Sequence, residues 1–147
     1  MVEADLPAVA ELESRCFPTP WGIEVLREEM KRDWGFVRVL RPAPGKGIVA
    51  FVCFWIVHDE VHVLVVATDP DHRGRGFARA LLEDMIGIAG KRGVRYAMLE
   101  VRKSNEAAIG LYASMGFDRV GVRPRYYADN REDAVVMMLT LPEPETP

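Results

Sequence analysis

Apolar residues recur along this chain with two different periods, and segments of the two kinds follow one another from end to end. Apolar side chains spaced three and four residues apart indicate amphipathic helices, whereas runs of β-branched and aromatic residues indicate strands. Helices are predicted at residues 5–16, 23–32, 106–115 and between the loop at 73–78 and Gly93. Strands are predicted at residues 36–40, 48–57, 61–68, 96–101, 117–122 and 133–141. The pattern therefore predicts a mixed α/β fold.

The connections between these elements predict how the strands pair. Residues 41–47 and 58–60 are short connections, so the strands that they join should form an antiparallel meander. A helix joins strands 61–68 and 96–101, and a right-handed crossover of that kind makes the two strands parallel. We therefore expect a mixed, mostly antiparallel sheet with one central parallel pair, splayed where a ligand enters, and helices on both faces. Residues 1–141 should form a single domain, and residues 142–147 a disordered tail.

Residues 61–88 are the most informative stretch, because a strand, a basic glycine loop and a helix follow one another there. The strand is almost continuously apolar, which suits burial on both faces. The loop leaves free backbone N–H groups at the start of a helix, amid three arginines, Arg73, Arg75 and Arg79. A phosphate or pyrophosphate is the natural ligand of such a loop, and a turn without a ligand is the alternative. The loop is neither a Walker A sequence nor a dinucleotide G-x-G-x-x-G, whose third glycine position is Arg79 here.

Composition narrows the class of partner. The chain has 147 residues, of which 49% are hydrophobic, and a net charge of -3. That length suits one core, and an acidic protein has no bulk attraction for nucleic acid. Cys16 and Cys53 are expected to be free thiols, and the scattered histidines indicate no metal site. No apolar run approaches the ~20 residues of a membrane span. The expected setting is the cytoplasm, with neither nucleic acid nor membrane as a partner.

Glu100 is the only charged residue in the apolar strand 96–101. It can lie at the edge of the sheet toward solvent, or it can pair with Arg102 or another basic residue. Alternatively, it is a partly desolvated carboxylate with a raised pKa, which suits a general base. Tyr112 alone would be a core tyrosine, and Asn105 alone a helix cap. The proline-rich loop 17–21 is either a packed loop or a wall of a substrate groove.

Two blocks of the sequence resemble the GNAT N-acetyltransferases. The first, residues 69–82, contains the acetyl-CoA loop pattern Gln/Arg-x-x-Gly-x-Gly/Ala, which Arg73, Gly76 and Ala78 meet. The second, residues 99–117, reads LEVRKSNEAAIGLYASMGF. Together they lie in the proper order at the right distance, and the resemblance extends over about half of the chain.

Three further segments narrow the resemblance to the RimI type, which acetylates the N-terminal alanine of a small-subunit ribosomal protein, and to its N-terminal acetyltransferase relatives. These segments are FPTPW at residues 17–21, the pair Tyr126-Tyr127, and REDA at residues 131–134.

The resemblance implies acetyl-CoA as the co-substrate and assigns roles to particular residues. Glu100 would be the general base, directly or through water, and Tyr112 the acid that protonates the leaving CoA thiolate. Trp21, Tyr126 and Tyr127 would line the groove for the peptide. The cofactor-binding residues would be Val66, Ala67, Thr68, Arg73, Gly74, Arg75, Gly76, Phe77, Ala78, Arg79 and Asn105.

An α-amine is an easier acceptor than lysine for a weak base such as Glu100. The pKa of an α-amine is about 7.8 against about 10.4 for lysine, so deprotonating lysine costs about 3.5 kcal/mol more at the same pH. We therefore expect acetylation of the N-terminal α-amine of a protein, of the ribosomal-protein-alanine type. The alternatives are another amine acceptor (a lysine side chain, a polyamine or a small-molecule amine) and a non-catalytic acyl-CoA-binding module.

Two departures from the family pattern concern the N-terminal part of the chain. The strand with which family members usually begin is missing or reduced to residues 2–4, and Gly22 stands where relatives often have a serine helix cap. An exposed sheet edge could follow from the first departure. The expected oligomeric state is a monomer or a weak homodimer.

Overall fold

The helices and strands predicted from the sequence are all present, and their ends lie within two residues of the predicted ones. The structure is a computed structural model that describes residues 1–142, so the predicted tail lies outside the described residues from residue 143 onward. No helix in the described range is both long and apolar enough to cross a membrane. In chain order the elements are η1 (Glu3–Asp5), α1 (Leu6–Cys16), α2 (Ile23–Lys31), β1 (Gly35–Leu40), β2 (Ala50–Val57), β3 (Glu60–Thr68), η2 (Pro70–His72), α3 (Phe77–Lys91), β4 (Tyr96–Arg102), α4 (Glu106–Ser114), β5 (Asp118–Arg123) and β6 (Ala134–Thr140).

The strands of the described chain are ordered β1-β2-β3-β4-β6-β5 across one sheet. β1 runs antiparallel to β2, and β3 runs parallel to β4 where residues 60–62 pair with residues 96–98. β6 lies between β4 and β5 and is antiparallel to both. The predicted mixed sheet with a parallel pair and flanking helices is confirmed. The splaying of that pair and the single domain over residues 1–141 stay predictions.

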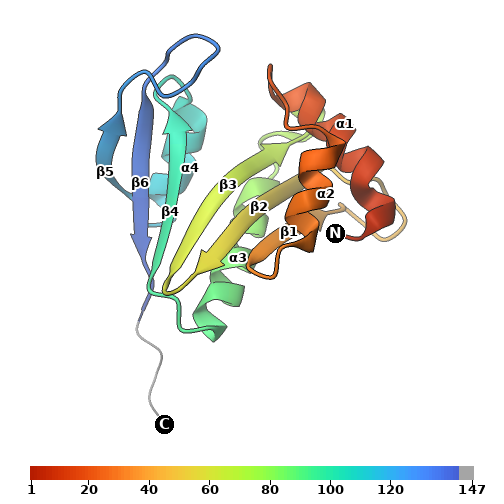
Figure 1. The fold of residues 1–147 in the computed structure, drawn as a ribbon, viewed down its shortest axis with the longest axis horizontal. Helices are drawn as coiled ribbons and strands as arrows, with labels where there is room; N and C mark the ends of the chain where they lie inside the picture. Colours follow the sequence, from red (N-terminus) through yellow and green to blue (C-terminus); the bar gives the residue numbers. More distant parts are fainter. Residues whose placement is uncertain (143–147) are drawn as a thin grey trace. The chain divides into compact units, whose positions relative to one another are not determined.

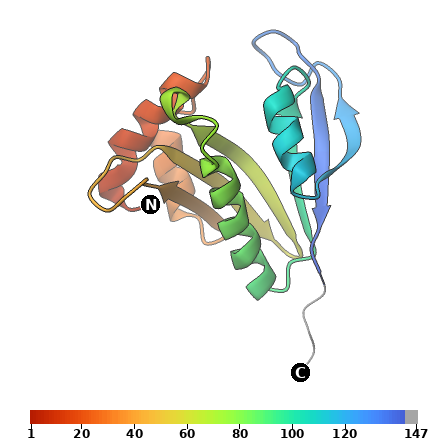
Figure 2. The same ribbon diagram turned by 180° about the vertical axis from the view of Figure 1, so that it is seen from behind.

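The chain divides into two compact units, of which the first comprises residues 1–55 and 64–87. In this unit α2 lies in front of β1 and β2 in Figure 1, and α3 lies in front of them when the molecule is turned in Figure 2. Each large apolar side chain that leaves water here contributes about 1.5–3 kcal/mol. One cluster of buried core residues consists of Leu6, Val9, Leu12, Leu26, Val37, Phe51, Cys53, Val65 and Ala67.

The segment before α1 is the short 3₁₀ helix η1, not a reduced strand. The Asp5 carboxylate accepts a hydrogen bond from the Val2 N–H (2.9 Å) and pairs with Arg41 (2.6 Å). It makes no hydrogen bond to the first turn of α1. The Asp5 side chain therefore does not cap α1, although aspartate is a common helix cap, because Val2 and Arg41 already bind its carboxylate.

Three carboxylates are buried in this unit, those of Glu13, Glu29 and Asp69. Glu29 is 5% exposed, and it accepts hydrogen bonds from Trp55 Nε1 (2.7 Å) and Arg32 Nε (3.2 Å). Glu13 is 1% exposed and accepts a bond from the Gly22 N–H (3.0 Å) at the start of α2. A buried carboxylate is tolerated when partners satisfy it. Glu13 therefore binds the backbone at the position where a serine cap was expected.

The second unit comprises residues 56–63 and the described chain from residue 88 onward. α4 lies over β4 and β6 in Figure 2, and β5 forms the outer strand. Tyr112 on α4 is buried and packs against Phe117, with ring centroids 5.9 Å apart. Gly116 (φ 102°) follows α4, and its left-handed backbone conformation is typical of the residue after a helix.

Candidate active site

The glycine loop forms the turn into α3 that the sequence predicted. Gly74 (φ 78°) and Gly76 (φ 81°) have left-handed backbone conformations, which residues with a Cβ rarely adopt. The hydrogen bond from the Ala80 N–H to the Gly76 carbonyl (3.0 Å) closes the first helical turn, so the preceding amides have no acceptor within the helix. A Cβ built at either glycine would meet no atom within 4 Å. The loop therefore presents backbone N–H groups beside open space, an arrangement that suits phosphate.

Asp69 fixes the start of this loop. Its carboxylate accepts a hydrogen bond from the Asp71 N–H (2.9 Å) and forms an ion pair with Arg15 on α1. The Asp71 amide, and then Arg15, hold the pKa of Asp69 below its usual value. Arg73 lies beside Cys16: burial raises the pKa of the Cys16 thiol, and the charge of Arg73 opposes that rise. Asp69 and Arg73 therefore attach the loop region to the end of α1.

Val66, Ala67 and Thr68 form the end of β3, where buried and partly exposed residues alternate. Ala67 belongs to the core, whereas Val66 and Thr68 are partly exposed. None of residues 61–68 is exposed, and the partly buried Leu64 also packs against the core, so the residues between the fully buried ones are only partly covered. The Thr68 carbonyl accepts a hydrogen bond from Cys16 Sγ (3.3 Å). Trp21 is partly buried against the same core, which favours the packed-loop interpretation of residues 17–21.

Glu100 on β4 is paired rather than isolated. Its Oε1 lies 2.9 Å from Arg123 Nε, and its side chain is 27% exposed. The carboxylate also hydrogen-bonds Tyr126, and this bond is the first cause that raises the pKa of Tyr126 to about 12. Glu100 is therefore a partly exposed carboxylate that has an arginine and a phenol as partners. Of the alternatives left open by the sequence, pairing is observed, but with Arg123 and not with Arg102.

Three tyrosines lie around this part of the second unit. Burial, and then Tyr127, raise the pKa of Tyr112 to about 12, so its phenol keeps its proton at neutral pH. Tyr126 and Tyr127 meet edge to face, with centroids 5.1 Å apart. Burial also raises the pKa of Tyr127, while the charge of Arg102 opposes that rise. The predicted catalytic pair and the two predicted acceptor tyrosines therefore belong to one neighbourhood.

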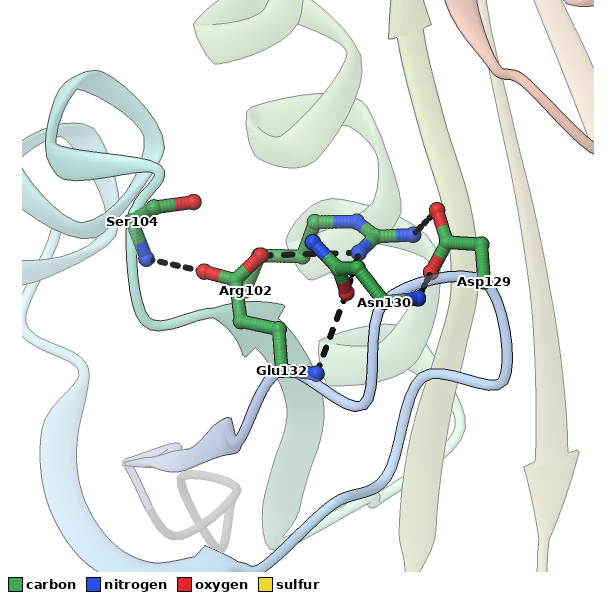
Figure 3. Close-up of polar contacts among 5 residues, drawn as sticks. All are labelled: Arg102, Ser104, Asp129, Asn130 and Glu132. Carbon is green, nitrogen blue, oxygen red and sulfur yellow. Dashed lines mark hydrogen bonds and ion pairs between the residues drawn. The ribbon is translucent and has the colours of Figure 1, made fainter.

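Asn105 caps α4, as its position alone predicted. Its Oδ1 accepts a hydrogen bond from the Ala108 N–H (3.2 Å). Close to this cap, Arg102 reaches the segment after β5 and binds several of its polar side chains (Figure 3). Sequence reasoning missed this contact, and it missed Arg123 as the partner of Glu100. The segment from Arg123 to Tyr127 was the one signal in the sequence that could have indicated these contacts, because two arginines and two tyrosines lie close together there.

The predicted site residues fall into two sets, one in each unit. Trp21, residues 66–68 and residues 73–79 belong to the first unit. Glu100, Asn105 and the three tyrosines belong to the second. Among residues 1–142, no three His, Cys, Asp or Glu side chains are grouped so as to hold a metal ion.

Known proteins show the same sequence pattern and fold over nearly all of the chain. The profile described as Acetyltransferase (GNAT) family matches residues 6–117. The chain is 39% identical over 139 residues to the ribosomal protein bS18-alanine N-acetyltransferase of Escherichia coli strain K12, covering 93% of this chain and 92% of that protein. The crystal structure of the ribosomal-protein-S18-alanine N-acetyltransferase from Escherichia coli is 38% identical with a TM-score of 0.86, covering 96% of this chain and 90% of that one. The structure of Arabidopsis thaliana NAA60 in complex with acetyl-CoA shares the fold, with a TM-score of 0.83 at 20% identity and 96% of each chain covered. The protein therefore belongs to the GNAT family of acetyltransferases.

Proposed function

We propose that this acetyltransferase uses acetyl-CoA to acetylate the N-terminal α-amine of a protein, of the ribosomal-protein-alanine type. The observation that carries the proposal is the Glu100 carboxylate, which a phenol and a guanidinium contact in a neighbourhood with two further tyrosines. The acceptor class is supported by the name of the Escherichia coli relative that is 39% identical. It is also supported by the low pKa of an α-amine, because a single weak base such as Glu100 can deprotonate an α-amine more easily than a lysine.

Acetyl-CoA supplies the acetyl group as a thioester, and several groups of this chain fit its polar parts. The amides of residues 74–79 and the exposed Arg75 would bind the pyrophosphate. The backbone of residues 66–68 would pair with the pantetheine arm as an added strand. Asn105 uses its Oδ1 to cap α4, so its NH₂ group is the part that would contact the cofactor.

Glu100 would take the proton of the attacking amine, and Tyr112 would donate a hydrogen bond to the departing thiolate. Arg123 is 55% exposed, so a positively charged N-terminus can replace it as the partner of Glu100 at small cost. That exchange brings the ammonium proton to the base. The aromatic residues Trp21, Tyr126 and Tyr127 would contact the first residues of the acceptor.

A panel of acceptors with acetyl-CoA tests this proposal. The first acceptor copies the alanine N-terminus of ribosomal protein bS18, and the second is the same peptide with a blocked N-terminus and an added lysine. A polyamine and a small-molecule amine complete the panel. We expect turnover with the free N-terminus only. Turnover of the lysine peptide or of either small amine, without turnover of the first peptide, would assign a different acceptor.

Gly76→Asp should abolish measurable binding of acetyl-CoA. The new carboxylate would stand at the glycine loop, where it would repel the pyrophosphate and fill the open space beside the amides. We expect the Kd to rise by about 100-fold or more, which corresponds to about 2.7 kcal/mol. Isothermal titration calorimetry with acetyl-CoA measures it directly.

Gly45→Asp is the matched control, because Gly45 also has a positive φ and open space beside it. Gly45 has φ 77° and, like Gly76 (φ 81°), no atom within 4 Å of a built Cβ, but it lies between β1 and β2. Both variants therefore carry the same charge change and place a side chain at a positive φ. Equal loss of acetyl-CoA affinity in both would mean that the glycine loop has no particular role in binding.

A further inference from the structure

Arg102 makes more polar contacts with the chain after β5 than one ion pair requires (Figure 3). Its Nη2 lies 2.9 Å from the Asp129 carboxylate, and its Nη1 lies 3.2 Å from Asn130 Oδ1 and 3.5 Å from Glu132 Oε1. Its guanidinium also lies 4.0 Å from the centre of the Tyr127 ring. A guanidinium offers five N–H donors in a fixed plane, so one side chain can satisfy all of these partners at once.

The partners of Arg102 all belong to residues 124–133, which we call the β5–β6 loop. This loop contains two residues with left-handed backbone conformations, Arg125 (φ 51°) and Arg131 (φ 58°). Such conformations are strained in non-glycine residues and persist where neighbouring contacts hold them. The Arg125 N–H donates to Asp133 Oδ1 (3.0 Å), and the Arg131 N–H donates to the Tyr127 carbonyl (2.8 Å). The loop is therefore held in one specific, strained conformation.

A second contact ties the same loop to the chain after β4. The Ser104 N–H donates to Glu132 Oε2 (2.6 Å), and the Lys103 N–H donates to the Asp133 carbonyl (3.1 Å). Hydrogen bonding from Ser104, and then from Asn130 and Arg102, lowers the pKa of Glu132. Glu132 is thus shared between the end of β4 and Arg102.

The position of Arg102 gives this anchor a consequence for the reaction. Arg102 and Glu100 are two residues apart on β4, so their side chains leave the same face of the strand. The β5–β6 loop that Arg102 holds carries Tyr126, which hydrogen-bonds Glu100, and Tyr127, which packs on Arg102. We propose that Arg102 is a positioning residue for the acceptor, because it fixes the β5–β6 loop in the conformation that binds the acceptor's N-terminus. This inference rests on the proposed function, since it assigns the acceptor to this loop.

Hydrogen exchange tests the anchor without any substrate. In Arg102→Met, the amides of residues 124–133 should exchange at least about five times faster than in the wild type, while those of β4 and β6 stay protected. Asp129→Asn removes a partner from the loop side and should give the same change to a smaller extent. If Arg102→Met does not fold, Asp129→Asn tests the same contact. Unchanged exchange of residues 124–133 in the folded variants would overturn the proposal.

Steady-state kinetics tests the effect on the acceptor. In Arg102→Met we expect the KM of the N-terminal alanine peptide to rise about tenfold or more, and the KM of acetyl-CoA to stay within about twofold. Arg102→Lys keeps the charge but not the planar fork, so its peptide KM should lie between those of Arg102→Met and the wild type. A merely structural role would lower the fraction of active protein, and hence kcat, without moving the peptide KM. An unchanged peptide KM, or equal rises of both KM values, would overturn the proposal.

Arg38→Met is the matched control. Arg38 lies on β1, outside the β5–β6 loop, and makes a two-point ion pair with Asp84 on α3 (2.8 and 3.2 Å). It should change neither loop exchange nor the peptide KM. Failure of the proposed function would appear as an absence of peptide turnover by the wild type. Failure of the present inference would appear as unchanged loop exchange in Arg102→Met, so the two are distinguishable.

Discussion

Glu100→Gln should lower kcat about 100-fold at pH 7 and leave the Kd of acetyl-CoA unchanged. The amide keeps the size of the side chain and can still contact Tyr126, but it cannot accept the proton of the amine. General base catalysis is worth about 10²–10⁴-fold, and a 100-fold loss corresponds to about 2.7 kcal/mol. The structural cost is small, because Arg123, which loses its partner, is 55% exposed.

The loss should depend on pH with a definite sign. The acceptor's α-amine has a pKa of about 7.8, so below that pH most of it carries a proton that Glu100 would remove. The ratio of wild-type to Glu100→Gln rates should therefore be larger at pH 6.5 than at pH 9, where the neutral amine already predominates. Initial rates with the alanine peptide over this range measure it.

Glu60→Gln is the control for this variant. Glu60 is also a strand glutamate, and it is 42% exposed and lies 3.0 Å from its basic partner His62. Rates within about twofold of the wild type are expected for Glu60→Gln. A near-wild-type rate for Glu100→Gln, or a loss that does not vary with pH, would remove Glu100 as the base.

Local signals in the sequence predicted the elements of this fold because each depends on residues close together in the chain. The periods of apolar residues placed the helices and strands, and Gly93, which has a positive φ, marked the end of the helix after the glycine loop. The strand–helix–strand order predicted the parallel pairing of β3 and β4, because crossover connections allow little choice. The glycine loop before α3 belongs to the same class of prediction.

Contacts between residues on strands that are neighbours in the sheet but distant in the chain could not be predicted from the sequence. β6 is the last strand in the chain, yet it lies between β4 and β5. Ala134 on β6 therefore pairs with Arg102 on one side and with Arg123 on the other. A chain read in order places β5 beside β4 and gives no reason for Glu100 to meet Arg123. The buried Glu29 shows the same limit, because one of the two partners that satisfy its carboxylate is the distant Trp55.

The environment of Tyr112 also changes what the predicted acid can do. Burial raises its pKa to about 12, whereas a thiol has a pKa of about 8.5. Complete transfer of the phenolic proton to the thiolate would therefore be uphill in this environment. A hydrogen bond from the phenol still stabilises negative charge as it develops on sulfur, and a buried donor does so strongly because little water competes. We therefore propose that Tyr112 acts chiefly by donating a hydrogen bond as the C–S bond breaks.

Tyr112→Phe should accordingly lower kcat by about 10²–10⁴-fold, since phenylalanine keeps the packing on Phe117 and removes only the hydroxyl. Because the pKa of Tyr112 is about 12, its titration should not limit the wild-type rate at any pH between 6 and 10.

Tyr96→Phe on β4 is the matched control, with kcat expected within about twofold of the wild type. Stopped-flow measurement of CoA release over this pH range tests both points. A wild-type rate that falls with a pKa near 9, a fall that Tyr112→Phe removes, would mean that the tyrosine transfers its proton fully. A near-wild-type kcat for Tyr112→Phe would mean instead that Tyr112 is a core tyrosine and that the thiolate leaves without its help.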